Sequence, residues 1–161
     1  MVLAELAVAF LLAAPQQRTV GCEEAIDTVW FPHAGSVQYP SQLVLGSVSA
    51  PGRHVPQSSP AGAPPWTHFS KWGMVIRSGP GADVSVSVPR AWRDRLAISW
   101  GNAGHAVYHT LRFRRCGADA GVGTAYAGGF FLRREGGCVP LRFRVGTRTR
   151  LVWFGIVRRC R

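Results

Sequence analysis

Residues 83–89 have the sequence DVSVSVP, in which valine and serine alternate. Successive side chains of a strand point to opposite faces of a sheet, so this alternation predicts a β-strand with valines facing a core and serines facing solvent. On both sides of this segment, short apolar stretches recur at intervals of about 8 to 14 residues, separated by turn-forming residues. The other predicted strands are residues 42–49, 73–79, 95–101, 109–116, 126–134, 138–146 and 149–160.

About eight short strands without helical periodicity between them predict an all-β fold, an antiparallel β-sandwich of Ig-like or jelly-roll type. The chain has 161 residues, of which 47% are hydrophobic, enough for the core of one domain and too many for a disordered chain. Its 19 glycines and 11 prolines favour many turns over a helical bundle. One helical turn is expected at residues 89–95, PRAWRDR.

Several segments carry more specific predictions. Residues 151–157, LVWFGIV, are apolar on both faces, which is typical of a central strand covered on both sides. Gly128 and Gly129 interrupt a predicted strand and indicate a bulge or a close backbone approach. Residues 50–66 contain five prolines and are predicted to form a loop, and residues 23–41 show no period and are predicted to be irregular.

The N-terminus contains a nine-residue apolar run, Leu6–Ala14, which matches the hydrophobic part of a signal peptide and is far shorter than a membrane span of about 20 residues. The run lacks a preceding Lys or Arg and follows Glu5, a departure that a start codon assigned too late would explain. The alternative is a core helix, but no polar stripe accompanies the run. We therefore expect a signal-like helical leader at residues 1–20, one domain at residues 21–161, and an extracellular or cell-surface location without a transmembrane segment.

The four cysteines are Cys22, Cys116, Cys138 and Cys160, and no CxxC motif is present, so zinc-ribbon spacing is absent. An even number of cysteines in an exported chain predicts two disulfides; a lipidated Cys22, or four free thiols in a cytosolic protein, are the alternatives. The strand order places Cys138 and Cys160 at one end of the last two strands, which leaves Cys22 to pair with Cys116. A hairpin through residue 146 puts Cys138 opposite residue 156, so a bend must bring Cys160 back, and the connectivity is one of three possible.

No sequence motif indicates catalysis, and we expect a non-catalytic protein without cofactor or metal. Residues 121–129, GVGTAYAGG, lack the GxGxxG spacing and a following helix, and no GxSxG occurs. His105 and His109 are four residues apart, which on a strand separates them by about 13 Å. A small secreted hydrolase remains an alternative, because a Ser-His-Asp triad is assembled in space rather than in sequence.

Positive charge is the strongest chemical signal in the chain. The net charge is +11, and residues 110–161 hold twelve arginines against two carboxylates. Arg112, Arg114, Arg142 and Arg144 alternate with apolar residues, so the pleat turns them outward, where guanidinium groups can bind phosphate or carboxylate polymers. The possible partners are a cell-wall polymer, a surface protein, or nucleic acid as a non-specific polyanion. The sequence itself favours the simpler alternative of a solvated basic surface.

Four of the six tryptophans fall into two groups by position. Trp100 and Trp153 are predicted to face the core, because they follow the alternation of predicted strands. Trp66 and Trp92 lie in predicted loops, where an exposed ring could stack on a sugar or a base, or could instead close the end of a sandwich.

Four segments, KWGMVIRSG, TAYAGGFFLRR, CVPLRFRVG and FGIVRRC, resemble a group of uncharacterised exported proteins of high-GC Gram-positive bacteria. The resemblance covers residues from about 70 to 161 and the GCE at 21–23. It implies export and a single β domain, and it implies no activity or functional residue. The function we expect is a structural or interaction role at the cell surface, with polyanion binding and hydrolysis as the alternatives.

Overall fold

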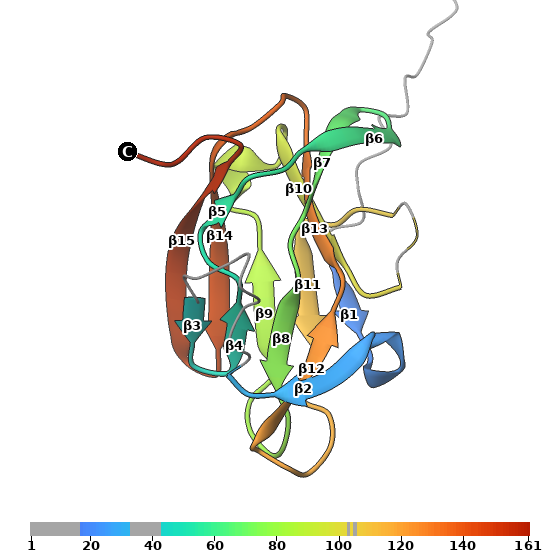
Figure 1. The fold of residues 1–161 in the computed structure, drawn as a ribbon, viewed down its shortest axis with the longest axis vertical. Helices are drawn as coiled ribbons and strands as arrows, with labels where there is room; N and C mark the ends of the chain where they lie inside the picture. The colour runs from blue at the N-terminus through green and yellow to red at the C-terminus, as the bar shows by residue number, and fades with distance from the viewer. Residues whose placement is uncertain (1–16, 33–42, 103, 105) are drawn as a thin grey trace, which may run out of the picture.

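The computed structural model describes residues 17–32, 43–102, 104 and 106–161. Within these residues, fifteen β-strands form three sheets (Figure 1). Two 3-10 turns, η1 (Cys22–Glu24) and η2 (Arg90–Trp92), lie between strands. Most of the strand pairs are antiparallel, and only β1 with β11 and β5 with β15 are parallel. The prediction of an all-β fold is confirmed, as is the helical turn at η2.

The largest sheet has six strands and carries the predicted basic residues. Its strands, in spatial order, are β1 (Arg18–Val20), β11 (Thr110–Phe113), β9 (Val84–Ser87), β14 (Gly137–Val145), β15 (Arg148–Ile156) and β5 (His54–Val55). The segment DVSVSVP forms β9 as predicted, with Val84 and Val86 fully buried and Ser85 and Ser87 partly exposed.

Two smaller sheets pack against the inner face of the six-stranded sheet. The five-stranded sheet contains β2 (Asp27–Trp30), β12 (Val122–Tyr126), β8 (Met74–Arg77), β4 (Val48–Ala50) and β3 (Leu43–Leu45). The four-stranded sheet contains β10 (Leu96–Trp100), β13 (Gly128–Leu132), β7 (Trp66–Lys71) and β6 (Ser59–Ala63). The two sheets are joined through the chain at β7–β8 and β12–β13, where the Trp72 N–H donates to the Gly128 carbonyl oxygen at 2.8 Å.

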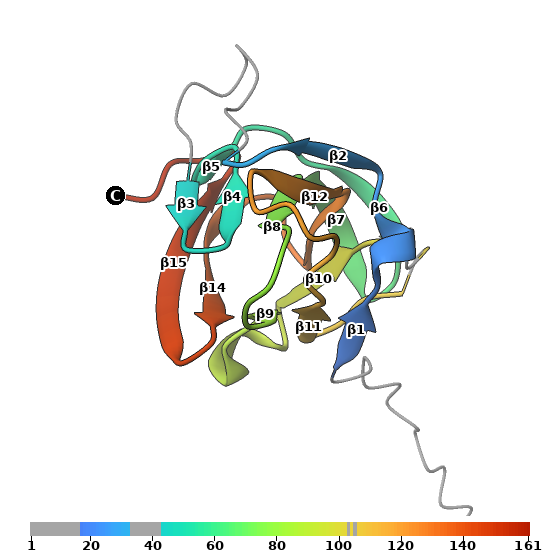
Figure 2. The ribbon, with the colours of Figure 1, turned by 90° about the horizontal axis from the view of Figure 1, so that it is seen from below.

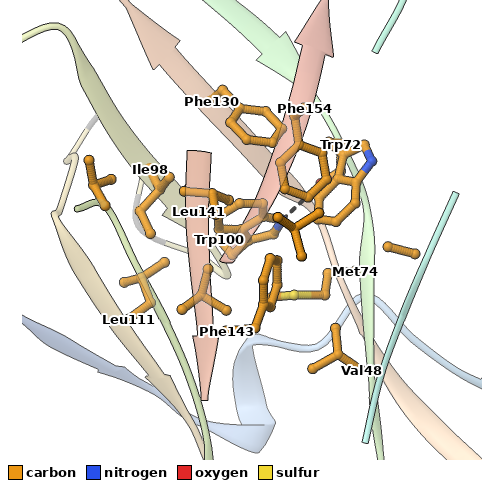
Figure 3. Packing of buried hydrophobic residues seen from close by; sticks show 14 of the residues in the cluster. Val48, Trp72, Met74, Ile98, Trp100, Leu111, Phe130, Leu141, Phe143 and Phe154 are labelled. Carbon is orange, nitrogen blue, oxygen red and sulfur yellow. Dashed lines mark hydrogen bonds between the residues drawn. The ribbon is translucent and has the colours of Figure 1, made fainter. Parts of the chain in front are cut away.

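The main core lies between these three sheets and is built around large aromatic side chains (Figure 3). The Trp72 ring meets that of Phe154 edge to face at 4.9 Å, and the Trp100 Nε1–H donates to the Trp72 carbonyl oxygen at 2.8 Å. Gly129 brings the backbones close: a Cβ there would overlap the Ser70 carbonyl oxygen on the neighbouring strand. The prediction of a close backbone approach at the paired glycines is therefore confirmed.

Several predicted element boundaries are wrong, because short strands with turn residues leave little periodic signal. Residues 42–49 do not form one strand, since Gly46, with φ of 59°, makes the turn between β3 and β4. Residues 23–41 include β2 instead of being irregular throughout. The proline-rich residues 50–66 contain β5 and β6, each at the edge of its sheet, where a missing proline N–H costs no ladder bond.

At the N-terminus, residues 18–20, the last residues of the predicted leader, form β1 beside β11, and Val20 is fully buried in the core. The rest of the expected leader, including its apolar run Leu6–Ala14, lies outside the described residues. Among the residues that the structure describes, no helix has the length and apolar character needed to cross a membrane.

The apolar sequence of β15 predicted a central strand covered on both faces, and this prediction is wrong. Its outer neighbour β5 covers only Gly155 and Ile156, and the side chains of Leu151 and Trp153 are 52% and 42% exposed. The core side of this strand consists of Val152, Phe154 and Ile156. Because LVWFGIV is apolar on both faces, its sequence could not show which face is open to solvent.

Candidate functional site: a basic face and a groove at its edge

The outward surface of the six-stranded sheet carries three of the four predicted arginines in one pattern. Arg112 lies on β11, and Arg142 and Arg144 lie on β14; all three are exposed. Strand β9 separates the two strands and contributes Ser85, which is paired with both Arg112 and Arg144. Hereafter the Arg face means Arg112, Arg142 and Arg144 with the two serines between them, Ser85 and Ser87.

The spacing of these arginines follows from strand geometry. Arg142 and Arg144 are two residues apart on one strand, which separates their Cα atoms by about 7 Å. Arg112 is two strands away from Arg144 in the same row, a separation of about 10 Å. The small serines keep the space between the guanidinium groups open, so the three charges can meet neighbouring anionic groups of one polymer.

Arg114, the fourth predicted residue, lies just past the end of β11 and belongs to a different surface. It lines a shallow depression together with Asp83 and Arg115. Arg115 is held by structural contacts, since its guanidinium donates to the Ser47 hydroxyl at 2.9 Å and to the Ser78 carbonyl oxygen at 2.8 Å. The alternating sequence predicted an outward direction for Arg114 correctly, but not its place beyond the strand.

No carboxylate among the described residues forms an ion pair with the Arg face. Within the described part of the chain the ion pairs are Arg18 with Glu24 and Arg95 with Asp94, and neither involves the Arg face. Arg144 Nε donates to the Gly146 carbonyl oxygen at 3.1 Å, a contact within its own hairpin that leaves its charge uncompensated. The surface therefore has a positive potential available to an external anion.

An aromatic pair borders the Arg face. Trp153 on β15 and Trp92 of η2 meet edge to face with ring centroids 5.6 Å apart, and the Arg95 guanidinium lies 4.3 Å from the Trp92 ring. The prediction that Trp153 lies in the core is wrong, whereas Trp100 is fully buried as predicted. Trp66, predicted in a loop, lies on β7 and is buried in a small second cluster on the far side of the four-stranded sheet.

A groove of about 940 Å³ runs along the open side of β15, and we call it the edge groove. One wall is formed by Leu43 and Leu45 of β3, which both views place beside β15 (Figure 1, Figure 2). The other side is formed by β15 itself, including Leu151 and Trp153, and the chain that follows β15 closes one end.

The lining of the edge groove is strongly basic. Its charged and titratable residues are Arg53, His54, Arg150, Arg159 and Arg161, and the described lining includes no Asp or Glu. His54 Nδ1 lies 3.1 Å from the Gly155 carbonyl oxygen, and since a carbonyl only accepts, Nδ1 carries the proton in this bond. Sequence analysis missed this cluster, because its members come from β5, β15 and the C-terminal segment.

The two disulfides join Cys22 to Cys116 and Cys138 to Cys160, the pairs chosen from the strand order. Cys138 stands opposite Gly155 in the hairpin, and the chain turns back after Ile156 through Val157, whose φ is 62°. The returning segment crosses Gly155, where a Cβ would lie only 2.8 Å from the Cys160 nitrogen. The second disulfide therefore holds Arg159 and Arg161 at the closed end of the edge groove.

The opposite edge of the sheet, at β1, contains a fully partnered charge cluster. Glu24 forms an ion pair with Arg18 and accepts the N–H groups of Gly21 at 3.0 Å and Asn102 at 2.9 Å. Burial by itself raises the pKa of Glu24, but these hydrogen bonds and the Arg18 charge together hold the pKa below its ordinary value. Nearby, burial and the charges of Glu24 and Glu23 raise the pKa of Tyr126 to about 12.

The three described histidines do not meet a carboxylate in the part of the chain that the structure describes. His54 contacts the Gly155 carbonyl, His109 Nε2 lies 3.1 Å from the Arg93 carbonyl oxygen, and His68 Nδ1 lies 2.8 Å from the Thr67 hydroxyl. Burial, which outweighs the Arg93 contact, lowers the pKa of His109. His105 of the predicted pair lies outside the described residues, and no group of three or more His, Cys, Asp or Glu among those described could hold a metal ion.

Comparison of the chain with family models, with curated proteins and with solved structures finds no match.

Proposed function

We propose that this protein is an exported, non-catalytic β-sandwich domain that binds an anionic polymer through the Arg face. Two disulfides and three sheets around a shared core support the exported sandwich, since disulfides persist in oxidising compartments. The observation that carries the binding function is the set of Arg112, Arg142 and Arg144 on one flat surface without a carboxylate partner among the described residues.

The proposed ligand is a polymer with repeating phosphate, sulfate or carboxylate groups. Each guanidinium can donate two parallel hydrogen bonds to such a group, and its planar fork is less hydrated than an ammonium. Because the three side chains project from one face of the sheet with serines between them, the proposed contacts depend on the charge of the polymer and not on the shape of a particular monomer. Binding would thus depend on charge spacing, and release of counterions from the polymer would supply most of the free energy.

The Arg face can be tested with heparin and inorganic polyphosphate as probes. The Arg142→Ser, Arg144→Ser double variant removes two charges from the face, and the matched control, Lys71→Ser with Arg134→Ser, removes two exposed charges from the four-stranded sheet and the loop after it. We expect the Arg-face variant to elute from heparin at lower salt than the control, and to bind polyphosphate more weakly. Equal elution of the two variants would contradict the proposal, because only net charge would then matter.

A further inference from the structure

Within the described part of the chain, strand β15 has a backbone edge beside the edge groove that pairs with no other strand before Gly155. The Gly155 N–H points to this side, because it donates to the Arg53 carbonyl oxygen of the β5 segment at 2.8 Å. Hydrogen-bonding direction alternates along a regular strand, and the β14–β15 register has no bulge, so the N–H and C=O groups of Thr149, Leu151 and Trp153 point the same way. Trp153 stands opposite Pro140, which has no N–H to donate. This agrees with a non-hydrogen-bonded pair at this position of the hairpin, in which the Trp153 backbone groups point away from β14.

The sheet ends at this edge within the described residues. Strand β5 pairs only with Gly155 and Ile156, so the preceding part of β15 has a strand neighbour on one side alone. An unpaired edge of about five residues is a template for another extended chain. The edge groove lies at this position, with the Leu43 and Leu45 side chains across from it.

The residues around this edge define the chemistry of a complementary chain. Exposed Leu151 and Trp153 would contact apolar side chains on one face of an added strand. Arg150, on the other face of β15, and Arg159, at the closed end, would meet carboxylates. A second copy of this protein is a poor occupant, because each copy has a net charge of +11 and would bring arginines against arginines.

We propose that the edge groove binds an extended acidic peptide segment, which adds to the six-stranded sheet as a strand beside β15. Main-chain hydrogen bonds would supply affinity, and the arginines would select for Asp or Glu at alternate positions. A polysaccharide or polyphosphate lacks the alternating donors and acceptors that this edge requires. The site differs from the Arg face and does not rest on the function proposed for it.

The probe is a synthetic peptide of alternating valine and glutamate, long enough to cover the open edge, titrated into the intact oxidised protein by calorimetry. We expect the Arg150→Ser, Arg159→Ser variant to weaken binding by about tenfold or more, as expected for lost charge-assisted contacts, and the control Arg112→Ser, Arg114→Ser, whose residues lie on or just after β11 and away from β15, to change it by less than about twofold. Near-ultraviolet circular dichroism verifies that both variants are folded. An alternating valine–lysine peptide should not bind.

N-methylation of the peptide distinguishes strand addition from charge attraction. Only every second peptide N–H faces the protein in an added strand, so methylating one alternate set should abolish binding and methylating the other should be tolerated. Amide NMR signals of Leu151 and Trp153 should shift on binding. Three results would overturn the proposal. The first is equal affinity of the two methylated peptides, and the second is no binding of the unmethylated peptide. The third is competition by polyphosphate at equal charge concentration together with no effect of methylation.

Discussion

The two edges of the six-stranded sheet use arginine in opposite ways. At the β1 edge, Arg18 forms an ion pair with Glu24 and donates to the Trp100 carbonyl oxygen at 3.2 Å. At the β15 edge, on the other side of the molecule (Figure 1), Arg150 and Arg159 line a groove whose described lining contains no Asp or Glu. The arginine at the β1 edge therefore links parts of the fold, whereas the arginines at the β15 edge have charges that an external ligand can reach.

The number of arginines therefore does not separate structural charges from free ones, whereas the presence or absence of protein partners among the described residues does. Removing a charge with several protein partners leaves the others unsatisfied and should lower stability. Removing an exposed charge without a protein partner should leave stability nearly unchanged and affect only binding. The following experiments test whether the two edges separate in this way.

The largest expected effect comes from the disulfides at the two edges. Cys22–Cys116 closes a loop with a sequence separation of 94 residues, and Cys138–Cys160 closes one of 22. Since the loop-entropy contribution grows with loop length, replacing the first pair by serine should lower the free energy of unfolding by about 4 to 5 kcal/mol and replacing the second by about 3 kcal/mol. Urea unfolding of the two double variants measures this difference, and a larger loss from the shorter loop would contradict the ranking.

The shorter disulfide should also matter for ligand binding, although it contributes less to stability. Without the Cys138–Cys160 bond, the segment that carries Arg159 and Arg161 is no longer fixed at the groove. We expect the Cys138→Ser, Cys160→Ser variant to bind the valine–glutamate peptide several-fold more weakly while its heparin elution stays close to that of the wild type. Unchanged peptide affinity would show that the disulfide does not position these arginines.

A smaller loss is expected from Glu24→Gln at the partnered edge. The substitution weakens charge-assisted hydrogen bonds from Arg18, Gly21 and Asn102, and should destabilise the fold by about 1 to 3 kcal/mol. Glu135→Gln, in an exposed loop, is the matched control because it removes the same charge and should have little effect. Equal stability of the two variants by urea unfolding would show that the Glu24 cluster does not hold the edge.

The same carboxylate predicts a pH dependence. The pKa of Glu24 in the fold lies below its ordinary value of 4.5, so its contribution is complete above pH 4.5 and is lost as the pH falls through the lowered folded pKa. The wild type should therefore lose stability below pH 4.5 more steeply than Glu24→Gln. The unfolding midpoints of the two proteins, measured across this pH range, should converge at low pH. A difference in midpoint that stays constant with pH would contradict the prediction.

The sequence predicted the Arg face better than the edge groove, and the reason is physical. Alternation along a single strand fixes which side chains share a face, so the outward direction of Arg112, Arg142 and Arg144 is a local property. The edge groove depends on a two-residue parallel pairing of β5 with β15 and on a C-terminal segment that a disulfide folds back. Neither contact has a periodic signal in the sequence.

The wrong prediction for Trp153 also shows where local sequence patterns fail. Its segment is apolar on both faces, so the sequence could not separate the core side, which contains Phe154, from the exposed side. Of the strands that sequence analysis missed, β1 and β2 are short, β6 contains proline and glycine, and β12 contains Gly123, whereas β7 has no such interruption. The positions of β1, β2, β7 and β12 are set by pairing with strands distant in the sequence. Sequence therefore predicted the fold class and one surface, while the edges required the three-dimensional arrangement.

The most direct test of the central claim is the salt dependence of binding to a short DNA duplex, used as a polyanion of known charge density. Three phosphate contacts from the Arg face give a slope of log K against log salt of about −2.7, and Arg142→Ser with Arg144→Ser should reduce it to about −0.9. Its free energy of unfolding should change by less than about 0.5 kcal/mol, since exposed charges contribute little to stability. Equal slopes for wild type and variant, or a large loss of stability in the variant, would contradict the assignment of these arginines to an unpartnered binding face.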